Sequence, residues 1–338
     1  MLSRRPRRGA EAPLQAGLDV ASDAGSEGGH FDAEGDFAAL PVKLGRYGQA
    51  RHRAEAILAF LGTIGNGPAS RCPATRAADR LRNCGDYLLF HHYHTVDRVR
   101  LHAAQLCQQH LVCPLCAIRR ASKHVGAYVA RFETITAAAP QLRPVVITYT
   151  VKNGADLRER MAHLRSGLRK LTQHRQKVRR RSGAGSCTWG HLAGAVGALE
   201  VTWSKRHGWH PHMHMVGLCD GWMDQRDMSA EWRRITGDSF VVGIQQLDPA
   251  RAPADAFCEV LKYAVKFGGL PPSRVWEAAE ALAGQRLIFS LGAFRGVPEP
   301  TSLLDEPLDE LPFAELFFRY LGQGHYGLAP RNGTIHHD

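Results

Sequence analysis

The stretch Gly208-Trp209-His210-Pro211-His212-Met213-His214-Met215-Val216 places a histidine at every second position. This is the period of a β-strand, in which side chains two residues apart lie on the same face of the sheet. His212 and His214 can therefore direct two imidazole rings at one point, and imidazole is the commonest side-chain ligand of metal ions. Two imidazoles do not complete a metal site, so we expect further ligands from elsewhere in the chain.

The segment before this strand supplies a candidate for the next ligand. Residues 196–205 are predicted as a strand, and Arg206-His207-Gly208 as the turn of an antiparallel hairpin. Glu200 lies within an apolar part of that strand, where a carboxylate is costly unless it is paired or bound to a metal. We therefore predict Glu200 as the third ligand. His210 is the alternative third ligand. If Glu200 faces solvent instead, its side chain would bind no metal.

The helix predicted over residues 253–267 carries Glu259, Tyr263 and Lys266. The spacings of four and three residues put these side chains on one face. A phenol can act as a nucleophile, but with a pKa of about 10 it needs a nearby cation and a polarised electrophile at neutral pH. Lys266 would supply the cation and the histidine strand the metal. A phosphodiester is the electrophile that fits such a site.

Five of the eight cysteines fall within residues 70–125, and four of these, Cys84, Cys107, Cys113 and Cys116, are the candidate metal ligands. Cys113-Pro114-Leu115-Cys116 predicts a tight turn that directs two thiolates at one tetrahedral ion. Cys84 and Cys107 would complete a four-thiolate Zn²⁺ site, with His110 as an alternative ligand. A redox pair would share the Cys-x-x-Cys spacing but is typical of an α/β unit. The segment is therefore predicted as a small structural zinc module.

Residues 156–181 predict a long helix with one apolar stripe, and its other faces carry ten Arg and Lys against two acidic residues. Such an excess favours contacts with phosphates, although a solvated helix face is the alternative. The predicted DNA-binding residues are Arg165, Arg169, Lys170, Arg175, Lys177, Arg179 and Arg180.

The composition agrees with a nucleic-acid partner. The 338 residues have a net charge of +11 and a hydrophobic fraction of 44%, which is ordinary for a globular protein. No apolar run reaches the length of a membrane span, and the first residues lack the apolar core of a signal peptide. We expect a cytoplasmic protein without a membrane partner. Residues 1–40 are predicted as a disordered basic tail.

Together these motifs resemble the rolling-circle replication initiators of small bacterial plasmids, which belong to the His-hydrophobe-His (HUH) endonucleases. The resemblance covers about residues 80–330. It rests on five stretches: His210-Pro211-His212-Met213-His214, Leu199-Glu200-Val201-Thr202, Glu259–Lys266, Cys107–Cys116 and Gly292-Ala293-Phe294-Arg295-Gly296.

The resemblance implies an α+β fold in which a central antiparallel sheet carries helices on one side, preceded by the zinc module. We expect the catalytic domain to span residues 140–296 and residues 297–338 to form a C-terminal linker and tail, in which the sequence itself predicts a short helix from Phe313. The elements predicted from the sequence agree with such a core: strands at 144–151, 240–247 and 286–291, and helices at 223–236 and 273–283.

The resemblance also implies roles. His212 and His214 would bind Mg²⁺ or Mn²⁺, and Lys266 would position the phosphate or the metal. Tyr263 would nick one strand at the double-strand origin, keep a 5′-phosphotyrosyl link and leave a 3′-hydroxyl for the host polymerase. In the single-tyrosine branch, a glutamate at the position of Glu259 is the general base of the terminating cleavage. The implied partners are double- and single-stranded plasmid origin DNA, a host helicase and a host polymerase.

Two other functions are compatible with parts of this pattern. A mobilisation relaxase or a single-strand transposase would use the same chemistry, but the cysteine module ahead of the catalytic half favours the initiator. A zinc-dependent DNA-binding regulator would explain the charge and the cysteines. It would give no reason for His212, His214, Glu259 and Tyr263 to occur together. The segment that recognises the origin stays open among the cysteine module, the basic helix and the C-terminal tail.

Overall fold

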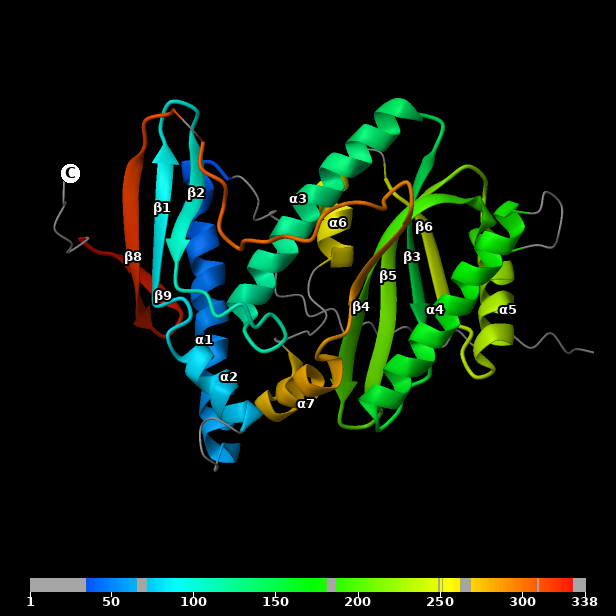
Figure 1. Ribbon diagram of the computed structural model, residues 1–338, viewed down its shortest axis with the longest axis horizontal. Helices are drawn as coiled ribbons and strands as arrows, with labels where there is room; N and C mark the ends of the chain where they lie inside the picture. Colours follow the sequence, from blue (N-terminus) through cyan, green and yellow to red (C-terminus); the bar gives the residue numbers. More distant parts are fainter. Residues whose placement is uncertain are drawn as a thin grey trace, which may run out of the picture. The chain divides into compact units, whose positions relative to one another are not determined.

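The histidine stretch forms strand β5 (Gly208–Cys219), which pairs antiparallel with β4 (Leu192–Ser204) across the predicted turn. The computed structural model describes residues 35–65, 72–180, 187–248, 250, 252–261, 269–308 and 310–330. Around the β4–β5 hairpin lies a five-stranded antiparallel sheet in the order β6-β3-β5-β4-β7 (Figure 1). Its other strands are β3 (Arg143–Thr150), β6 (Val242–Gln246) and β7 (Ile288–Gly292).

Both faces of this sheet are covered by helices. Trp209, Met213 and Met215 of β5 point to one face and join the apolar stripe of α4 (Leu157–Arg180) and the buried side chains of α5 (Gln225–Thr236). Val216 and Leu218 point to the other face, where they meet α6 (Pro253–Leu261) and the second half of α3 (Pro114–Ala138). The predicted α+β fold with an antiparallel sheet is confirmed, but the helices are not confined to one side.

A second antiparallel sheet, in the order β2-β1-β8-β9, joins the cysteine segment to the C-terminal segment. Its strands are β2 (Arg98–Ala104), β1 (Tyr87–Tyr93), β8 (Ala314–Gly322) and β9 (His325–Leu328). The short helix predicted from Phe313 is therefore wrong. Leu316 and Phe318 alternate with Glu315 and Phe317 across the two faces of β8, so the segment has the period of a strand.

Helices close one face of the second sheet. Helix α1 (Leu40–Ile64) runs beside β1 and β2 (Figure 1). Together with α2 (Pro73–Arg82), it shares a core with Leu88 and Phe90 of β1. The short helix η1 (Phe37–Ala39) leads into α1, so order begins before residue 40. Residues 1–34 of the predicted tail lie outside the described residues. The last helix, α7 (Pro272–Leu282), precedes β7 and contributes Val275 and Leu282 to the same core.

A buried network of charged side chains and hydrogen bonds holds residues 303–305, which follow β7, against α3 and β2. The Arg119 guanidinium donates to the Asp305 carboxylate at 2.6 Å, to the Leu303 carbonyl at 2.8 Å and to the Tyr47 hydroxyl at 2.9 Å. Lys123 also reaches Asp305, at 2.9 Å, and the Leu101 backbone N–H donates to the same carboxylate at 2.8 Å. Burial alone would raise the pKa of Asp305, but Arg119 and Lys123 outweigh burial and hold that pKa at about 2.

Asp305→Asn should lower the free energy of unfolding at neutral pH by about 3–5 kcal/mol, because Arg119 would stay buried without its counter-ion. In the wild type, the folded-state pKa near 2 lies below the ordinary value of 3.8. The contribution of the ionised Asp305 side chain to the free energy of unfolding is therefore complete above about pH 4 and is lost as the pH falls toward 2. Urea unfolding at several pH values measures both effects. Glu299→Gln, which removes the more exposed Arg120 pair, is the control and should change stability by less than about 1 kcal/mol. Equal stability of the two variants would contradict the network's role.

Candidate active site and metal centres

Glu200 and His212 are direct cross-strand partners in the β4–β5 hairpin, so their side chains share one face. His214, two residues along β5, lies on the same face. Oε2 of Glu200 is 3.7 Å from Nε2 of His212 and 3.8 Å from Nε2 of His214. Both distances are shorter than two metal–ligand bonds of about 2.1 Å, so one ion could contact all three side chains. Glu200, His212 and His214 thus form a candidate metal site, called the carboxylate–histidine group below.

Neighbouring groups fix the orientation of both imidazole rings. Nδ1 of His212 lies 3.2 Å from the His210 carbonyl oxygen, which can only accept a hydrogen bond. Nδ1 of His214 lies 2.8 Å from the Thr148 hydroxyl on the adjacent strand β3. With the proton on Nδ1, each Nε2 presents its lone pair to the point that Glu200 faces. The group is mostly buried, with Glu200 exposed by 5% and His212 by 7%. Three protein ligands leave coordination positions for a substrate oxygen.

His210 is separate from this group. Its Nδ1 is hydrogen-bonded to the Asn153 side chain, and although its ring centroid lies 5.3 Å from that of His212, His210 is not among the side chains whose ligand atoms all lie within 4.8 Å of one another. Of the two candidates for a third ligand, the structure brings Glu200 to the two histidines. Sequence reasoning missed Thr148, because its role depends on the register between β3 and β5, which pairs Thr148 with His214.

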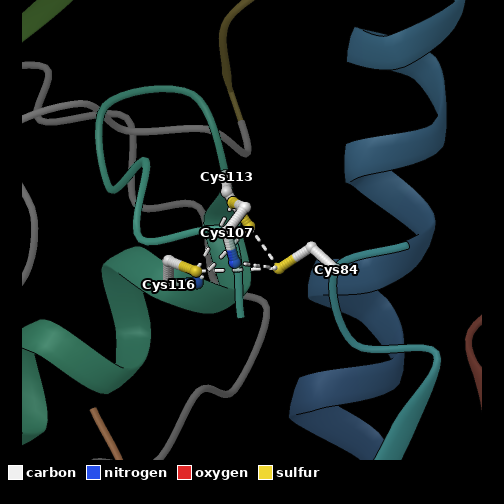
Figure 2. A group of neighbouring side chains, drawn as sticks. All are labelled: Cys84, Cys107, Cys113 and Cys116. Carbon is white, nitrogen blue, oxygen red and sulfur yellow. Dashed lines mark hydrogen bonds between the residues drawn. The ribbon is translucent and has the colours of Figure 1, made fainter. Parts of the chain in front are cut away.

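The four predicted cysteines converge from separate segments, as Figure 2 shows. The Sγ atom of Cys84 lies 3.5 Å from that of Cys113 and 3.6 Å from that of Cys116, and Cys107 lies 3.6 Å from Cys116. A tetrahedral Zn²⁺ with bonds of about 2.3 Å separates its sulfurs by about 3.8 Å. The side chains are exposed by at most 7%. The donor set and its spacing fit a closed structural metal site.

Local structure explains how the Cys-x-x-Cys turn forms. Cys113 caps the N-terminus of α3, with Pro114 in the first turn, and its sulfur accepts the Cys116 backbone N–H at 3.5 Å. Burial and the neighbouring thiols raise the pKa of Cys113 well above its ordinary value, so a buried thiolate here needs a cation. His110, the alternative ligand, instead lines a cavity of about 120 Å³ together with Arg120 and His124.

The predicted DNA-binding helix α4 lies on the sheet face opposite the carboxylate–histidine group. Arg175 is buried and donates to the Leu192 carbonyl at 2.6 Å, and Arg179 reaches the same oxygen at 2.7 Å. Arg165 donates to the Arg286 carbonyl at 3.1 Å and Lys170 to the Ile235 carbonyl at 3.3 Å. Arg169, Lys177 and Arg180 are exposed. That this helix contacts phosphates stays a prediction. Of the predicted residues, Arg175 is the least able to reach a phosphate, because its side chain is buried.

Tyr263 and Lys266 lie outside the described residues, so their predicted roles stay predictions. The described part of the same helix, α6, ends at Leu261 and packs Phe257 and Val260 against Val216 of β5. Val216 follows His214 on the same face of the strand. Glu259 is exposed on α6. The segment that leads to Tyr263 thus lies on the sheet face that carries the carboxylate–histidine group.

Comparison with known proteins identifies the family. A family model described as a replication protein matches residues 98–314, which include both β4 and β5. The chain belongs to this replication protein family. The match also includes Cys107, Cys113 and Cys116, whereas Cys84 precedes it. No helix in the described ranges is long and apolar enough to cross a membrane.

Several curated proteins named "Protein rep" are similar to this replication protein. That of Lentilactobacillus hilgardii is 23% identical over 257 residues, which cover 68% of this chain and 77% of that protein. That of Bacillus amyloliquefaciens is 32% identical over 148 residues, which cover 42% of this chain and 39% of that protein. The Bacillus sp. protein is 30% identical over 148 residues, or 42% of this chain and 43% of that protein. No solved structure matches the chain. The predicted recognition as a plasmid replication initiator is confirmed.

Proposed function

We propose that this replication protein nicks one strand of its plasmid origin through a tyrosine nucleophile and a divalent metal ion. The observation that carries the proposal is the meeting of Glu200, His212 and His214 on one sheet face, in a chain of the replication protein family. A site for structure alone would close its coordination shell with a fourth protein ligand. The carboxylate–histidine group offers three ligands, as a site that binds substrate does.

Each side chain has a part in this chemistry. Glu200, His212 and His214 would hold Mg²⁺ or Mn²⁺, while Thr148 and the His210 carbonyl keep the rings oriented. When bound, the ion neutralises a non-bridging phosphate oxygen. The Tyr263 phenolate attacks the phosphorus in line, and the 3′-oxygen leaves and takes a proton to become the 3′-hydroxyl. Lys266 stabilises the phenolate or the phosphate, and Glu259 activates water in the terminating step.

The remaining parts of the molecule support this reaction. Cys84, Cys107, Cys113 and Cys116 would hold a structural Zn²⁺. The exposed basic side chains of α4 would bind phosphates of duplex DNA that extends past the sheet. The strand with its new 3′-hydroxyl would pass to a host helicase and polymerase in the cytoplasm, where plasmid DNA is replicated.

A cleavage assay on supercoiled plasmid that carries the cognate origin tests the proposal. With Mn²⁺ present, we expect an open circular product with the protein linked to the DNA 5′ end. With a chelator present, neither the nick nor the adduct should form. Binding to a verified origin without any nick, in the presence of metal, would contradict the proposal and favour a non-catalytic regulator.

A further inference from the structure

The second sheet has one face that points away from the shared core, on which some side chains are buried and others, such as Phe313, are exposed. On β1, Leu88 and Phe90 point into the shared core, so Leu89, His91 and Tyr93 point to the opposite face. Their cross-strand partners share that face. The set of side chains on it, called the outer face below, comprises Tyr87, Leu89, His91 and Tyr93 of β1, Arg98, Arg100 and His102 of β2, Phe313 just before β8, and Glu315, Phe317, Arg319 and Leu321 of β8.

Flat rings form continuous stacks across the outer face. The His91 ring lies between His102 and Phe313, with centroid distances of 3.8 Å on both sides and interplanar angles of 15° and 9°. One row further along the sheet, Tyr87 stacks on Phe317 at 5.8 Å. Phe313 is 46% exposed, although it is a large apolar side chain at the end of such a stack. Its ring therefore offers a planar surface to solvent on which another planar group can stack.

Cations accompany these rings. Arg319 lies over the Phe317 ring at 5.6 Å, and Arg100 and Arg98 stand opposite His91 and Tyr93 on the neighbouring strand. The outer face as defined contains three arginines and one acidic residue, Glu315. A surface on which the exposed Phe313 ring and the partly buried Tyr87 and Phe317 rings lie among arginines matches a polyanion that also carries planar bases.

We propose that the outer face binds single-stranded DNA, a function distinct from the metal-dependent nick. Base faces are accessible for stacking only in unpaired DNA, and an antiparallel sheet with helices on its other side is a common support for such stacking. Phe313 and Phe317 would stack on bases, while Arg98, Arg100 and Arg319 contact phosphates. The proposal rests on the proposed function in one respect, because nicking at the origin is what supplies the single strand.

The test measures binding of fluorescent oligo(dT) of about 20 nucleotides by anisotropy, with a duplex of the same length beside it. Phe313→Ala combined with Arg319→Ala should raise the Kd for the single strand at least tenfold, because one stacking ring and one phosphate contact are lost. Arg53→Ala on α1 removes an exposed charge away from the outer face and should change that Kd by less than about threefold. Circular dichroism checks that the variants are folded.

Two readouts separate this inference from the proposed function. Weaker oligo(dT) binding by the double variant, together with absence of nicking by the wild type, would support the outer face and reject the nicking activity. Unchanged oligo(dT) affinity of the double variant would overturn the inference whatever the nicking result. An altered oligomeric state of that variant in sedimentation, with unchanged affinity for oligo(dT), would also overturn it and would assign the outer face to contacts between copies of the chain.

Discussion

Replacing His214 with alanine should lower the rate of metal-dependent nicking about a thousand-fold and weaken Mn²⁺ binding in calorimetry. The Nε2 of His214 is one of three ligand atoms in the carboxylate–histidine group, so its loss leaves two side chains to hold the ion. A thousand-fold effect corresponds to about 4 kcal/mol of transition-state stabilisation, the scale expected when a metal no longer neutralises a phosphate oxygen. The His214 side chain is 27% exposed, so its removal disturbs the core less than removal of His212.

Two companion variants make this experiment decisive. His210→Ala removes a neighbouring histidine of the same strand that hydrogen-bonds Asn153, and it should keep both Mn²⁺ affinity and most of the nicking rate. Tyr263→Phe should lose nicking and the 5′ adduct but keep Mn²⁺ affinity, because the phenol is the proposed nucleophile and no metal ligand. Nicking by His214→Ala at the wild-type rate, or equal losses of metal affinity in His210→Ala and His214→Ala, would reject the ligand assignment.

The two histidines of the carboxylate–histidine group could be predicted from the sequence because their spacing is local, whereas the third ligand stayed open between Glu200 and His210. The period of two in the histidine stretch gives the shared face of His212 and His214. The turn at residues 205–207 then sets the hairpin register, in which Ser204 pairs with Gly208 and Glu200 with His212. A slip of one residue would have placed Glu200 on the other face of the sheet. The four-cysteine site could be predicted for a different reason, since the spacing of Cys113 and Cys116 is itself typical of a turn that binds a metal ion.

Features that depend on contacts between distant parts of the chain could not be predicted from the sequence. β8 pairs with β1 more than 200 residues earlier, and only that pairing places Phe318 against the shared core and Phe317 on the outer face. Helix α1 contains Gly45, Gly48 and Gly62, which weaken a local helix signal, but Gly48 lies so close to the backbone of Gly324 that a side chain would collide there. The charge of Arg175 suggested a DNA contact, whereas its burial against the Leu192 carbonyl follows from the packing of α4 on the sheet.

Cys113→Ser should abolish zinc binding and lower the stability of the protein by several kcal/mol. Cys113 has two tasks, since its sulfur is one of the four converging donors and also caps α3. Zinc sites of four thiolates contribute their binding energy directly to folding. Here the group joins the segment before β1 to α3, the helix that also packs on the five-stranded sheet through Val125 and Tyr128. Loss of the ion should therefore loosen both the second sheet and the support of α6.

The measurements are the zinc content of the purified protein and its thermal unfolding. The wild type should contain one zinc per chain, and chelation should lower its melting temperature toward that of Cys113→Ser. Cys72→Ser is the matched control, because Cys72 lies in the same segment but outside the four-sulfur group. It should keep one zinc and a melting temperature within a few degrees of the wild type. A Cys113→Ser protein that retains full zinc, or a wild type indifferent to chelation, would show that the four sulfurs converge for packing alone.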